Sequence, residues 1–592
     1  MNDSRARRLA FTLFFVSLAL LALHRLFAYD IWWQIAAGDW IRANGWPQTD
    51  PFSYGFPNGE WIEPRWLFCL AVSFVWQISG ATGLILFKVT LVAAAFAAWF
   101  RALRDADLGP LLVGALATLL LVHERLLLRP ELISFIAIPL VLAWWPKAPR
   151  RLVALQLVWS NAHTLWILGP AIIWILTVGE ILQRKTIDRS KLLIAVIVSL
   201  VPLLNPWGLA GALNPIRLFL QIGEQHPLGQ TIHEFQSPFS ATFFAADFRT
   251  ITFLAVIALS LVGWWMNRKQ LNVGHLLLFA AFLFLAVRAQ RNVALFGLIA
   301  GWTLALNMTQ AGLLKSKARL IPIAAVTLWS LLTTFGFFYP AIGSEKQFGF
   351  GIAARYPVQA LDAIDASSRQ PRIFNTLGDG GYVLFRGGAD SVYVDGRLEV
   401  YSPQQLQTAI AATTDAATFQ SELQRTAATH ALVRLLPAHS ALIGVMERNP
   451  NWLPIFHNGH HVVYARRDAI TQPTAVIDWQ RATAEASTAA EYRRLATLYI
   501  AVSAFAPAEQ ALQAAYKLDP NEPTVRRYLG TLRQLNGDDA TSILGDLQPD
   551  NDLDTQLFAA EFLRQQRRPD EAVAYYRRAI ELGSDAPQTA VG

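Results

Sequence analysis

The chain has 592 residues, of which 53% are hydrophobic and only 16% are charged, and its mean hydropathy is +0.31. A soluble protein of this length would carry about a quarter charged residues, so the composition excludes an ordinary soluble enzyme and indicates a membrane protein. The net charge of +7 collects in short loops between apolar segments, where it indicates membrane orientation rather than nucleic-acid binding. The single cysteine, Cys69, excludes an intramolecular disulfide.

The first apolar segment, residues 9–27, follows a basic start and has no small-residue cleavage site at its end. We therefore interpret it as an uncleaved transmembrane helix with its basic start in the cytoplasm. The chain then emerges at Asp30 on the outer face of the membrane, into a loop of residues 29–64. This loop carries Asp39 and Asp50 among several tryptophans, a composition that indicates a site rather than a simple connection.

Apolar segments recur along residues 1–340 and predict a polytopic helical domain with about 10–12 spans. Segment 66–79 is either a true span or an interfacial helix, and residues 152–183 form either one kinked helix or two. The long loop 205–247 has no basic cluster, so we expect it on the outer face with the first loop. The remaining segments are about 81–100, 109–123, 131–146, 191–205, 249–266, 273–288, 291–308 and 319–340.

After Pro340 the chain changes character, because the apolar runs become short and are bracketed by turn residues. Strand-like runs alternate with helix-like stretches, which predicts a small α/β domain in residues 341–470. If the last span ends outside, this domain is periplasmic. The strand-like runs are at 371–385, 391–401, 429–436 and 459–467, and the helix-like stretches are at about 403–426 and 438–448.

Residues 471–592 contain a repeat whose small and large apolar residues are spaced as in a tetratricopeptide unit of about 34 residues. The small residues let two antiparallel helices approach closely, and a second copy fits nearly as well, whereas the copy between them is degenerate. We expect a short helical array that contacts the α/β domain or a partner protein. The first copy consists of Tyr492, Leu495, Ala496, Tyr499, Ala508, Leu512, Ala515 and Pro520, and the second of Ala560, Leu563, Ala572, Tyr576 and Ala579.

The first outer loop has the pattern Asp-x-Trp-Trp from Asp30, then Gly-Asp-Trp-Ile and, at 50–53, Asp-Pro-Phe-Ser. Further blocks are LLLRPELIS (126–134), WSNAHTLWILGP (159–170), LLNPWGL (203–209), IHEFQSP (232–238) and VRAQRNVALF (287–296). Together they resemble bacterial GT-C glycosyltransferases, multi-spanning enzymes that take a sugar from a polyprenyl-phosphate donor. The later FNTLGDGGYVLF and VYVDGR resemble the soluble domain of one branch of that superfamily, which often precedes tetratricopeptide repeats.

The resemblance implies an acidic catalytic residue just beyond the first span, and Asp30 matches that place. An aspartate there takes the proton of a weakly nucleophilic acceptor as general base. Asp50 is the second catalytic candidate, if the loop folds it back beside Asp30. Alternatively, Asp50 only forms a turn before Pro51, and Asp39 lies on the solvated face of a short helix.

Polar residues are costly inside a membrane, so each one in or near a span is a candidate for function. Arg129 is placed to meet a phosphate, and His163 either contacts substrate or bonds across helices. Glu234 lies in the second outer loop. Arg288 and Arg291 either clamp a pyrophosphate or follow the positive-inside tendency.

A divalent cation, Mg or Mn, is the one cofactor that the pattern suggests, because hard carboxylate oxygens bind such ions. Its candidate ligands are Asp30, Glu124 and Glu131, although Glu131 is equally placed to form an ion pair with Arg129. The sequence contains no P-loop, dinucleotide fingerprint, HExxH motif or zinc-type spacing.

Three functions fit these features, all at a bacterial inner membrane with membrane lipids as surroundings. The first is a hexosyl- or pentosyltransferase that uses a polyprenyl-phosphate sugar donor, with the repeats binding a partner protein. The second is a lipid or glycan transporter or flippase, which would show an internal repeat between its halves, and none is seen. The third is a scaffold in the cell envelope, for which a dozen spans and buried arginines are unnecessary.

Overall fold

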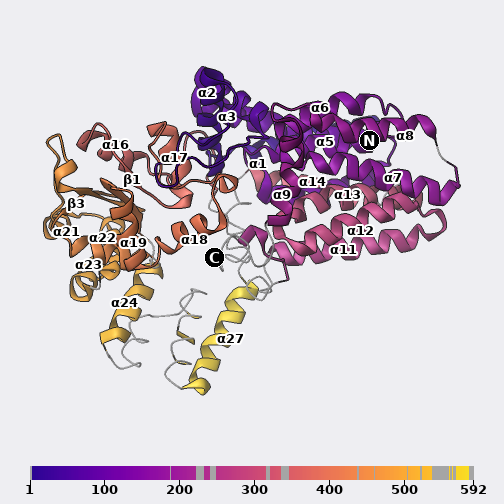
Figure 1. Ribbon diagram of the computed structural model, residues 1–592. Helices are drawn as coiled ribbons and strands as arrows, with labels where there is room; N and C mark the ends of the chain where they lie inside the picture. The colour runs from indigo at the N-terminus through magenta and orange to yellow at the C-terminus, as the bar shows by residue number, and fades with distance from the viewer. Residues whose placement is uncertain are drawn as a thin grey trace. The chain divides into compact units, whose positions relative to one another are not determined.

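The structure is a computed structural model, and its contacts divide the chain into two compact units (Figure 1). The membrane unit holds residues up to 50 and residues 60–353, and the C-terminal unit holds residues 51–59 and 354–589. The structure describes residues 3–186, 188–221, 233–239, 248–314, 320–334, 346–435, 439–458, 460–502, 504–520, 523–536, 556, 559–560, 563 and 568–585.

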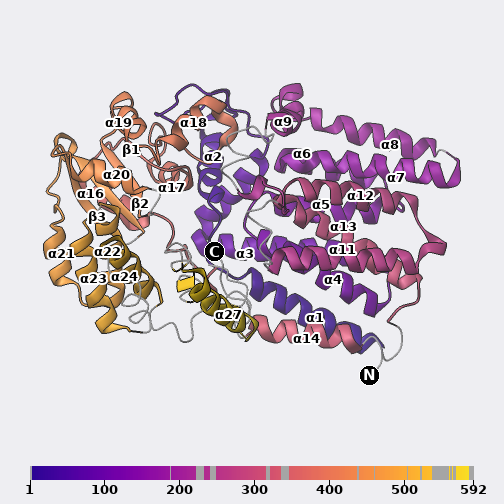
Figure 2. The same ribbon diagram turned by 90° about the horizontal axis from the view of Figure 1, so that it is seen from below.

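The membrane unit is a bundle of apolar helices, as predicted (Figures 1 and 2). In the described part of the chain, five helices are long and apolar enough to cross a membrane, and α8 with α9 forms a sixth candidate bent by 99°. The total of about 10–12 spans stays a prediction. The elements, with 3₁₀ helices written η, are α1 (Asp3–Ala22), α2 (Asp30–Asn44), α3 (Trp66–Ala102), α4 (Leu108–Val122), η1 (His123–Arg125), α5 (Glu131–Trp144), α6 (Arg151–Ala162), η2 (Thr164–Ile167), α7 (Leu168–Arg184), α8 (Arg189–Leu200), η3 (Val201–Leu203), α9 (Gly208–Gln221), η4 (His233–Phe235), α11 (Phe248–Met266), η5 (Arg268–Gln270), α12 (Val273–Arg288), η6 (Gln290–Asn292), α13 (Val293–Gln310) and α14 (Leu320–Thr334).

Two helix breaks concern segments that the sequence left open, although whether residues 66–79 span the membrane or lie at its interface stays a prediction. The segments 66–79 and 81–100 are the two halves of α3, which breaks at Gly80, where φ is 57° and ψ is −146°. Residues 152–183 form two helices, α6 and α7, because His163 between them has an extended backbone with φ −158° and ψ 141°. The second break places the polar side chain of His163 at a helix end instead of inside a continuous span.

Small residues bring α4 and α13 into close contact in the middle of the bundle. A Cβ atom added at Gly301 would lie 2.4 Å from the carbonyl oxygen of Gly114, and one at Gly297 would lie 2.7 Å from Cβ of Leu121. Without a hydrophobic driving force between helices in lipid, such close packing is the main source of their attraction. This close contact holds α4 and α13 together.

The C-terminal unit contains a four-stranded sheet in the order β1-β2-β4-β3, with β1 parallel to β2 and the other pairs antiparallel. A small sheet is therefore present after the membrane part, and the bounds 341–470 of an α/β domain stay a prediction. Its elements are α16 (Val358–Ser367), β1 (Ile373–Phe374), α17 (Leu377–Gly387), η8 (Leu398–Val400), α18 (Pro403–Ala411), α19 (Ala416–Arg425), β2 (His430–Arg434), α20 (Ser440–Glu447), β3 (Trp452–His457), β4 (His461–Arg466) and η10 (Arg467–Ala469).

The prediction for 371–385 is wrong beyond its first residues, because the GDGGYVLF stretch is the helix α17 rather than a strand. Asp379 favours the helix as an acidic residue in its first turn, where it accepts a hydrogen bond from the Thr376 hydroxyl at 2.9 Å. Position 380 requires glycine, because a Cβ atom there would collide with the carbonyl oxygen of Val394. Residues 391–401 form isolated bridges at Val392 and the 3₁₀ helix η8 instead of a strand, and β3 was not predicted at all.

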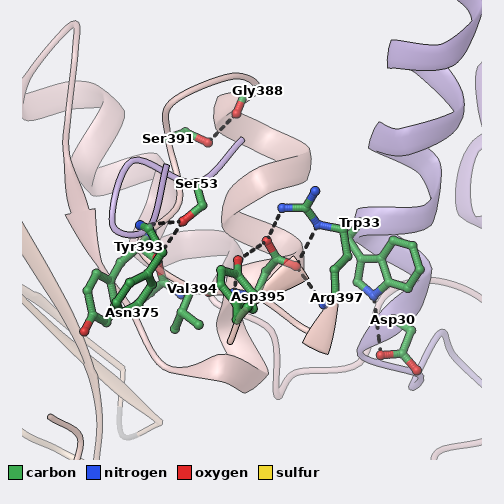
Figure 3. A network of polar contacts seen from close by, with 12 residues as sticks. Asp30, Trp33, Ser53, Asn375, Gly388, Ser391, Tyr393, Val394, Asp395 and Arg397 are labelled. Atoms are coloured by element: carbon green, nitrogen blue, oxygen red, sulfur yellow. Dashed lines mark hydrogen bonds and ion pairs between the residues drawn. The ribbon is translucent and has the colours of Figure 1, made fainter. Parts of the chain in front are cut away.

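The middle of the first outer loop, residues 51–59, belongs to the C-terminal unit. We call this segment the strap. Its backbone pairs with Val392, because Tyr54 N donates to the Val392 oxygen at 3.0 Å, and the Ser53 hydroxyl donates to the Tyr393 oxygen at 3.0 Å (Figure 3). Phe56 packs against Tyr393, and the Arg425 guanidinium lies 5.1 Å from its ring centre. Packing in the C-terminal unit therefore accounts for residues 51–53 of the DPFS motif, whereas Asp50 belongs to the membrane unit.

Gly55→Val is expected to detach the strap. A Cβ atom at position 55 would lie 2.4 Å from the Tyr393 carbonyl oxygen, and backbone cannot move away as a flexible side chain does. Overpacking of this kind costs about 1–3 kcal/mol. Limited chymotrypsin digestion of the whole protein should then cut within residues 51–59, and Asn58→Asp, at an exposed position of the strap, should leave it protected. Equal protection of both variants would contradict the assignment.

Helices α21 (Trp479–Glu485), α22 (Ala489–Ala501), α23 (Phe505–Leu518), α24 (Pro523–Asn536) and α27 (Pro569–Asp585) follow the sheet. In α22 and α23, the small residues Ala496 and Ala508 are fully buried, as the repeat pattern requires. The array contacts the α/β domain through Trp479, whose Nε1 donates to Glu447 Oε1 at 3.1 Å. A tetratricopeptide solenoid stays a prediction.

Candidate functional site

The candidate site lies in the membrane unit, where three segments far apart in sequence meet. Asp30 begins α2, the chain turns between η1 and α5 at residues 126–130, and η4 carries Glu234. The carboxylate of Asp30 stands in the first turn of α2, where the helix dipole favours a negative charge. Four of the residues proposed from sequence, Asp30, Arg129, Glu131 and Glu234, come together here.

Two arginines connect the carboxylates of this site. Arg125 lies 2.7 Å from Glu131 and 2.6 Å from Glu234. Arg129 lies 3.4 Å from the same Glu234 and 3.3 Å from Asp30. Glu131 therefore pairs with Arg125, not with Arg129. We call these five residues the charge network.

The members of the charge network differ in exposure. The side chains of Asp30 and Glu234 are 31% and 32% exposed, whereas that of Glu131 is 6% exposed. Burial would raise the pKa of Glu234, but the charges of Arg125, Arg129 and Arg291 outweigh it and lower that pKa to about 2. Glu234 is therefore ionised at any physiological pH, and it competes with other anions for the arginines.

His163 and Arg291 join the charge network from neighbouring helices. Nδ1 of His163 lies 2.7 Å from the Ser134 hydroxyl, which also accepts a hydrogen bond from Trp159 Nε1. His163 interacts electrostatically with Arg291 and Arg125, and Arg291 interacts with Glu234. His163 stands at the break between α6 and α7, and the hydrogen bond with Ser134 fixes its ring.

A second chain of contacts reaches Asp30 from the other side. Nε1 of Trp33 points at Asp30 Oδ1 at 3.5 Å, and the Arg65 guanidinium lies 4.7 Å from the Trp33 ring centre (Figure 3). Arg65 is held by the fully buried carboxylate of Glu63 at 2.6 Å. Arg65 and Glu63 were not predicted from the sequence, although they stand at the end of the acidic and aromatic loop that contains Asp30.

Positive charge exceeds negative charge around this site in the described part of the chain. Lys346 donates to the carbonyl oxygens of His123 and Glu124, and it interacts electrostatically with Arg125 and Arg129. Burial lowers the pKa of Lys346 to about 8, so it is still mostly charged at neutral pH. The basic side chains are Arg125, Arg129, Arg249, Arg291 and Lys346, and the carboxylates are those of Asp30, Glu124, Glu131 and Glu234. Such a surplus suits an anionic ligand.

Other sequence candidates lie elsewhere. Asp50 is buried one residue before the strap and is not one of the charge-network residues. Arg288 ends α12 with its guanidinium 5.9 Å from the Phe284 ring centre, so the structure does not show it as half of a clamp with Arg291. Asp39 is not merely solvated, because it accepts hydrogen bonds from Ser73 and Gln77 and thereby ties α2 to α3.

The described residues do not suit a divalent cation. No three side chains of His, Cys, Asp or Glu come together among them. Asp30 and Glu131 are each paired with an arginine, and Glu124 lies 3.7 Å from Arg249 and 3.6 Å from His123. Because cationic partners already neutralise these carboxylates, we derive no chemical step through a metal.

Comparisons with solved structures identify the architecture. The archaeal oligosaccharyltransferase AglB from Archaeoglobus fulgidus, in complex with an inhibitory peptide and a dolichol-phosphate, superposes with a TM-score of 0.53 at 10% identity, over 87% of this chain and 86% of that one. The chain has an oligosaccharyltransferase-like fold.

A second structure of an Archaeoglobus fulgidus oligosaccharyltransferase, tethered to an acceptor peptide that contains the NVT sequon, has a TM-score of 0.51 at 12% identity. It covers 79% of this chain and 75% of that one. No protein-family model matches the chain, and no curated protein is similar to it in sequence. The oligosaccharyltransferase-like fold fits the five apolar helices that are long enough to cross a membrane, and identity this low shows the fold alone.

Proposed function

We propose that the protein is a membrane glycosyltransferase that moves a sugar from a polyprenyl-phosphate-linked donor to an envelope acceptor, which is a lipid, a glycan or a protein. The reaction takes place on the outer face of a bacterial inner membrane, with the C-terminal unit on the same side. The single observation that carries the proposal is the charge network, in which a partly exposed aspartate stands beside arginines at the start of the first loop.

The residues of the charge network have separate roles in this reaction. Arg129 and Arg291 bind the phosphate of the donor, since guanidinium groups recognise phosphate oxygens by charge and geometry. Asp30 accepts the proton of the acceptor hydroxyl or amide while the acceptor oxygen or nitrogen bonds to the sugar carbon, and the bond from that carbon to the donor phosphate breaks. The arginines stabilise the negative charge that develops on the departing lipid phosphate.

His163 is proposed to orient substrate, with its ring held by Ser134 at 2.7 Å. The deeper pair of Arg125 with Glu131 supports the site without contacting substrate, because Glu131 is nearly buried. Asp50 stays a proposed second carboxylate, and Arg288 a proposed distant contact of the donor.

The comparison structures support a lipid-linked donor. The Archaeoglobus fulgidus enzyme is described with a dolichol-phosphate and an inhibitory peptide, and in a second structure with an acceptor peptide. On that basis we propose that this chain also binds a polyprenyl phosphate and a separate acceptor. The helices after the sheet are proposed to bind a protein partner that brings the acceptor.

The test is transfer by the purified whole protein in lipid nanodiscs. Polyprenyl-phosphate donors that carry radiolabelled hexoses or pentoses are mixed with an envelope extract as acceptor, and the label is followed from the lipid into the extract. We expect the label to move only when the protein is present. Movement of intact donor across a liposome membrane without loss of the sugar would favour the transporter instead.

A further inference from the structure

The two arginines of the charge network hold their partners very differently. Arg125 makes short contacts with two carboxylates, at 2.7 Å and 2.6 Å. Arg129 makes only long contacts, at 3.3 Å to Asp30 and 3.4 Å to Glu234. Among the described residues, Nε of Arg129 has no partner with hydrogen-bond geometry although it is buried. Arg129 is therefore a poorly satisfied cation, and Arg125 a well satisfied one.

Asp30 is the more replaceable partner of Arg129. Its side chain is 31% exposed, and its other polar contact, with Trp33 Nε1, is long at 3.5 Å. Glu234, by contrast, is held in place by its short ion pair with Arg125 at 2.6 Å. An ion pair that is partly exposed and poorly aligned contributes little stability, so breaking it costs little.

A phosphate group is a stronger partner for Arg129 than Asp30 is. It carries up to two negative charges and offers several oxygens to the guanidinium fork, which permits two short parallel hydrogen bonds. An adjacent positive charge stabilises the ionised form of a carboxylate and lowers its pKa. A carboxylate that loses its arginine therefore becomes a stronger base. One exchange of partners thus binds the donor and activates the base.

We propose that Arg129 acts as an exchange residue: it holds Asp30 in the empty protein and releases it when the donor phosphate takes its place. This rests on the proposed function, and it assigns a regulation to that same site. Asp30 then becomes a free base only when donor is bound, which keeps the acceptor from being deprotonated in the empty site.

The inference makes a prediction that a purely catalytic role for Asp30 does not. If Asp30 competes with the donor phosphate for Arg129, Asp30→Asn should bind the phosphate more tightly while it loses transfer. The expected decrease in Kd is about three- to tenfold, the scale of one partly exposed ion pair. In an Arg129→Gln background the same change should have no effect on Kd, because the competed cation is gone.

The experiment measures binding of farnesyl phosphate to the whole protein in nanodiscs by isothermal titration calorimetry. Wild type, Asp30→Asn, Arg129→Gln and the double variant form a cycle that isolates the coupling between the two residues. Asp39→Asn is the matched control on the same helix, since its carboxylate bonds only to residues outside the charge network among the contacts described. Its Kd should equal that of wild type.

Each other outcome overturns the inference. Weaker or unchanged binding by Asp30→Asn would show that Asp30 does not compete for Arg129, and a tightening that persists in the Arg129→Gln background would place the competition at another cation. The transfer assay separates this from the proposed function: weaker binding together with lost transfer would refute the exchange and leave the glycosyltransferase standing. Tighter binding by Asp30→Asn, with no transfer activity in wild type, would support the exchange and refute the glycosyltransferase.

Discussion

Asp30→Asn is expected to lower sugar transfer by about 100-fold or more, which is the usual scale for loss of a general base. Asparagine keeps the size of the side chain and one oxygen for the Trp33 contact, but it has neither the charge nor the basicity to accept the acceptor's proton. The melting temperature should change little, because the pair with Arg129 is long and partly exposed. The measurement is the initial rate of label transfer at saturating donor.

Two aspartates of the same loop serve as comparisons for Asp30. Asp39→Asn should be nearly silent, because its Oδ1, which accepts from Ser73, Gln77 and Arg42, is retained in asparagine. Asp50→Asn should have a strong effect on transfer if Asp50 shares the site and a mild one if it only shapes the approach to the strap. Near-normal transfer by Asp30→Asn would remove the best residue of the glycosyltransferase proposal, and normal transfer by all three variants would favour the transporter or scaffold.

Arg397→Met is expected to destabilise the C-terminal unit by about 3–5 kcal/mol, because it leaves a fully buried carboxylate without its cation. Arg397 and Asp395 are both 0% exposed and lie 2.6 Å apart, and Tyr401 donates a further hydrogen bond to Asp395 (Figure 3). The guanidinium also lies 4.9 Å from the ring centre of Phe52 in the strap, so the loss should reach the strap as well. The effect is measured by thermal unfolding of the purified whole protein, with protease cleavage within the C-terminal unit as the readout.

Arg386→Gln is the matched control for Arg397→Met in the same unit. Arg386 also contacts aspartates, Asp362 and Asp365, but these are 58% and 55% exposed, and water replaces the lost cation. The expected cost is below about 1 kcal/mol. Equal destabilisation by the two variants would mean that burial of the Asp395 pair is not what makes it important.

The candidate site was predicted in part, and the reason lies in how each residue is recognised. Asp30 stands out locally, as a carboxylate immediately after an apolar segment, and Arg129 and Glu234 stand out as charges in apolar surroundings. Arg125 has the same local character as Arg129, but only Arg129 was proposed from the sequence. The role of Arg125 became visible only through Glu234, which lies 109 residues away in the sequence.

The helical breaks show the same limit for the fold. Apolar length predicts that residues 152–183 cross the membrane region, but the break at His163 depends on what its side chain meets, namely Ser134 on another helix. The GDGGYVLF stretch was interpreted as a strand from its apolar residues, whereas Thr376, Asp379 and Gly380 make it a helix in the packed domain.

The sequence by itself determined the membrane character, the α/β domain after residue 340 and the acidic residue beyond the first helix, because each follows from composition and spacing within a short window. Only the tertiary structure decided that the strap leaves the membrane unit for the C-terminal one, since DPFS reads as a turn until Val392 and Tyr393 supply its hydrogen-bond partners. It also decided which arginine holds which carboxylate. Pairing of charges depends on distances between segments far apart along the chain, and no local pattern encodes those distances.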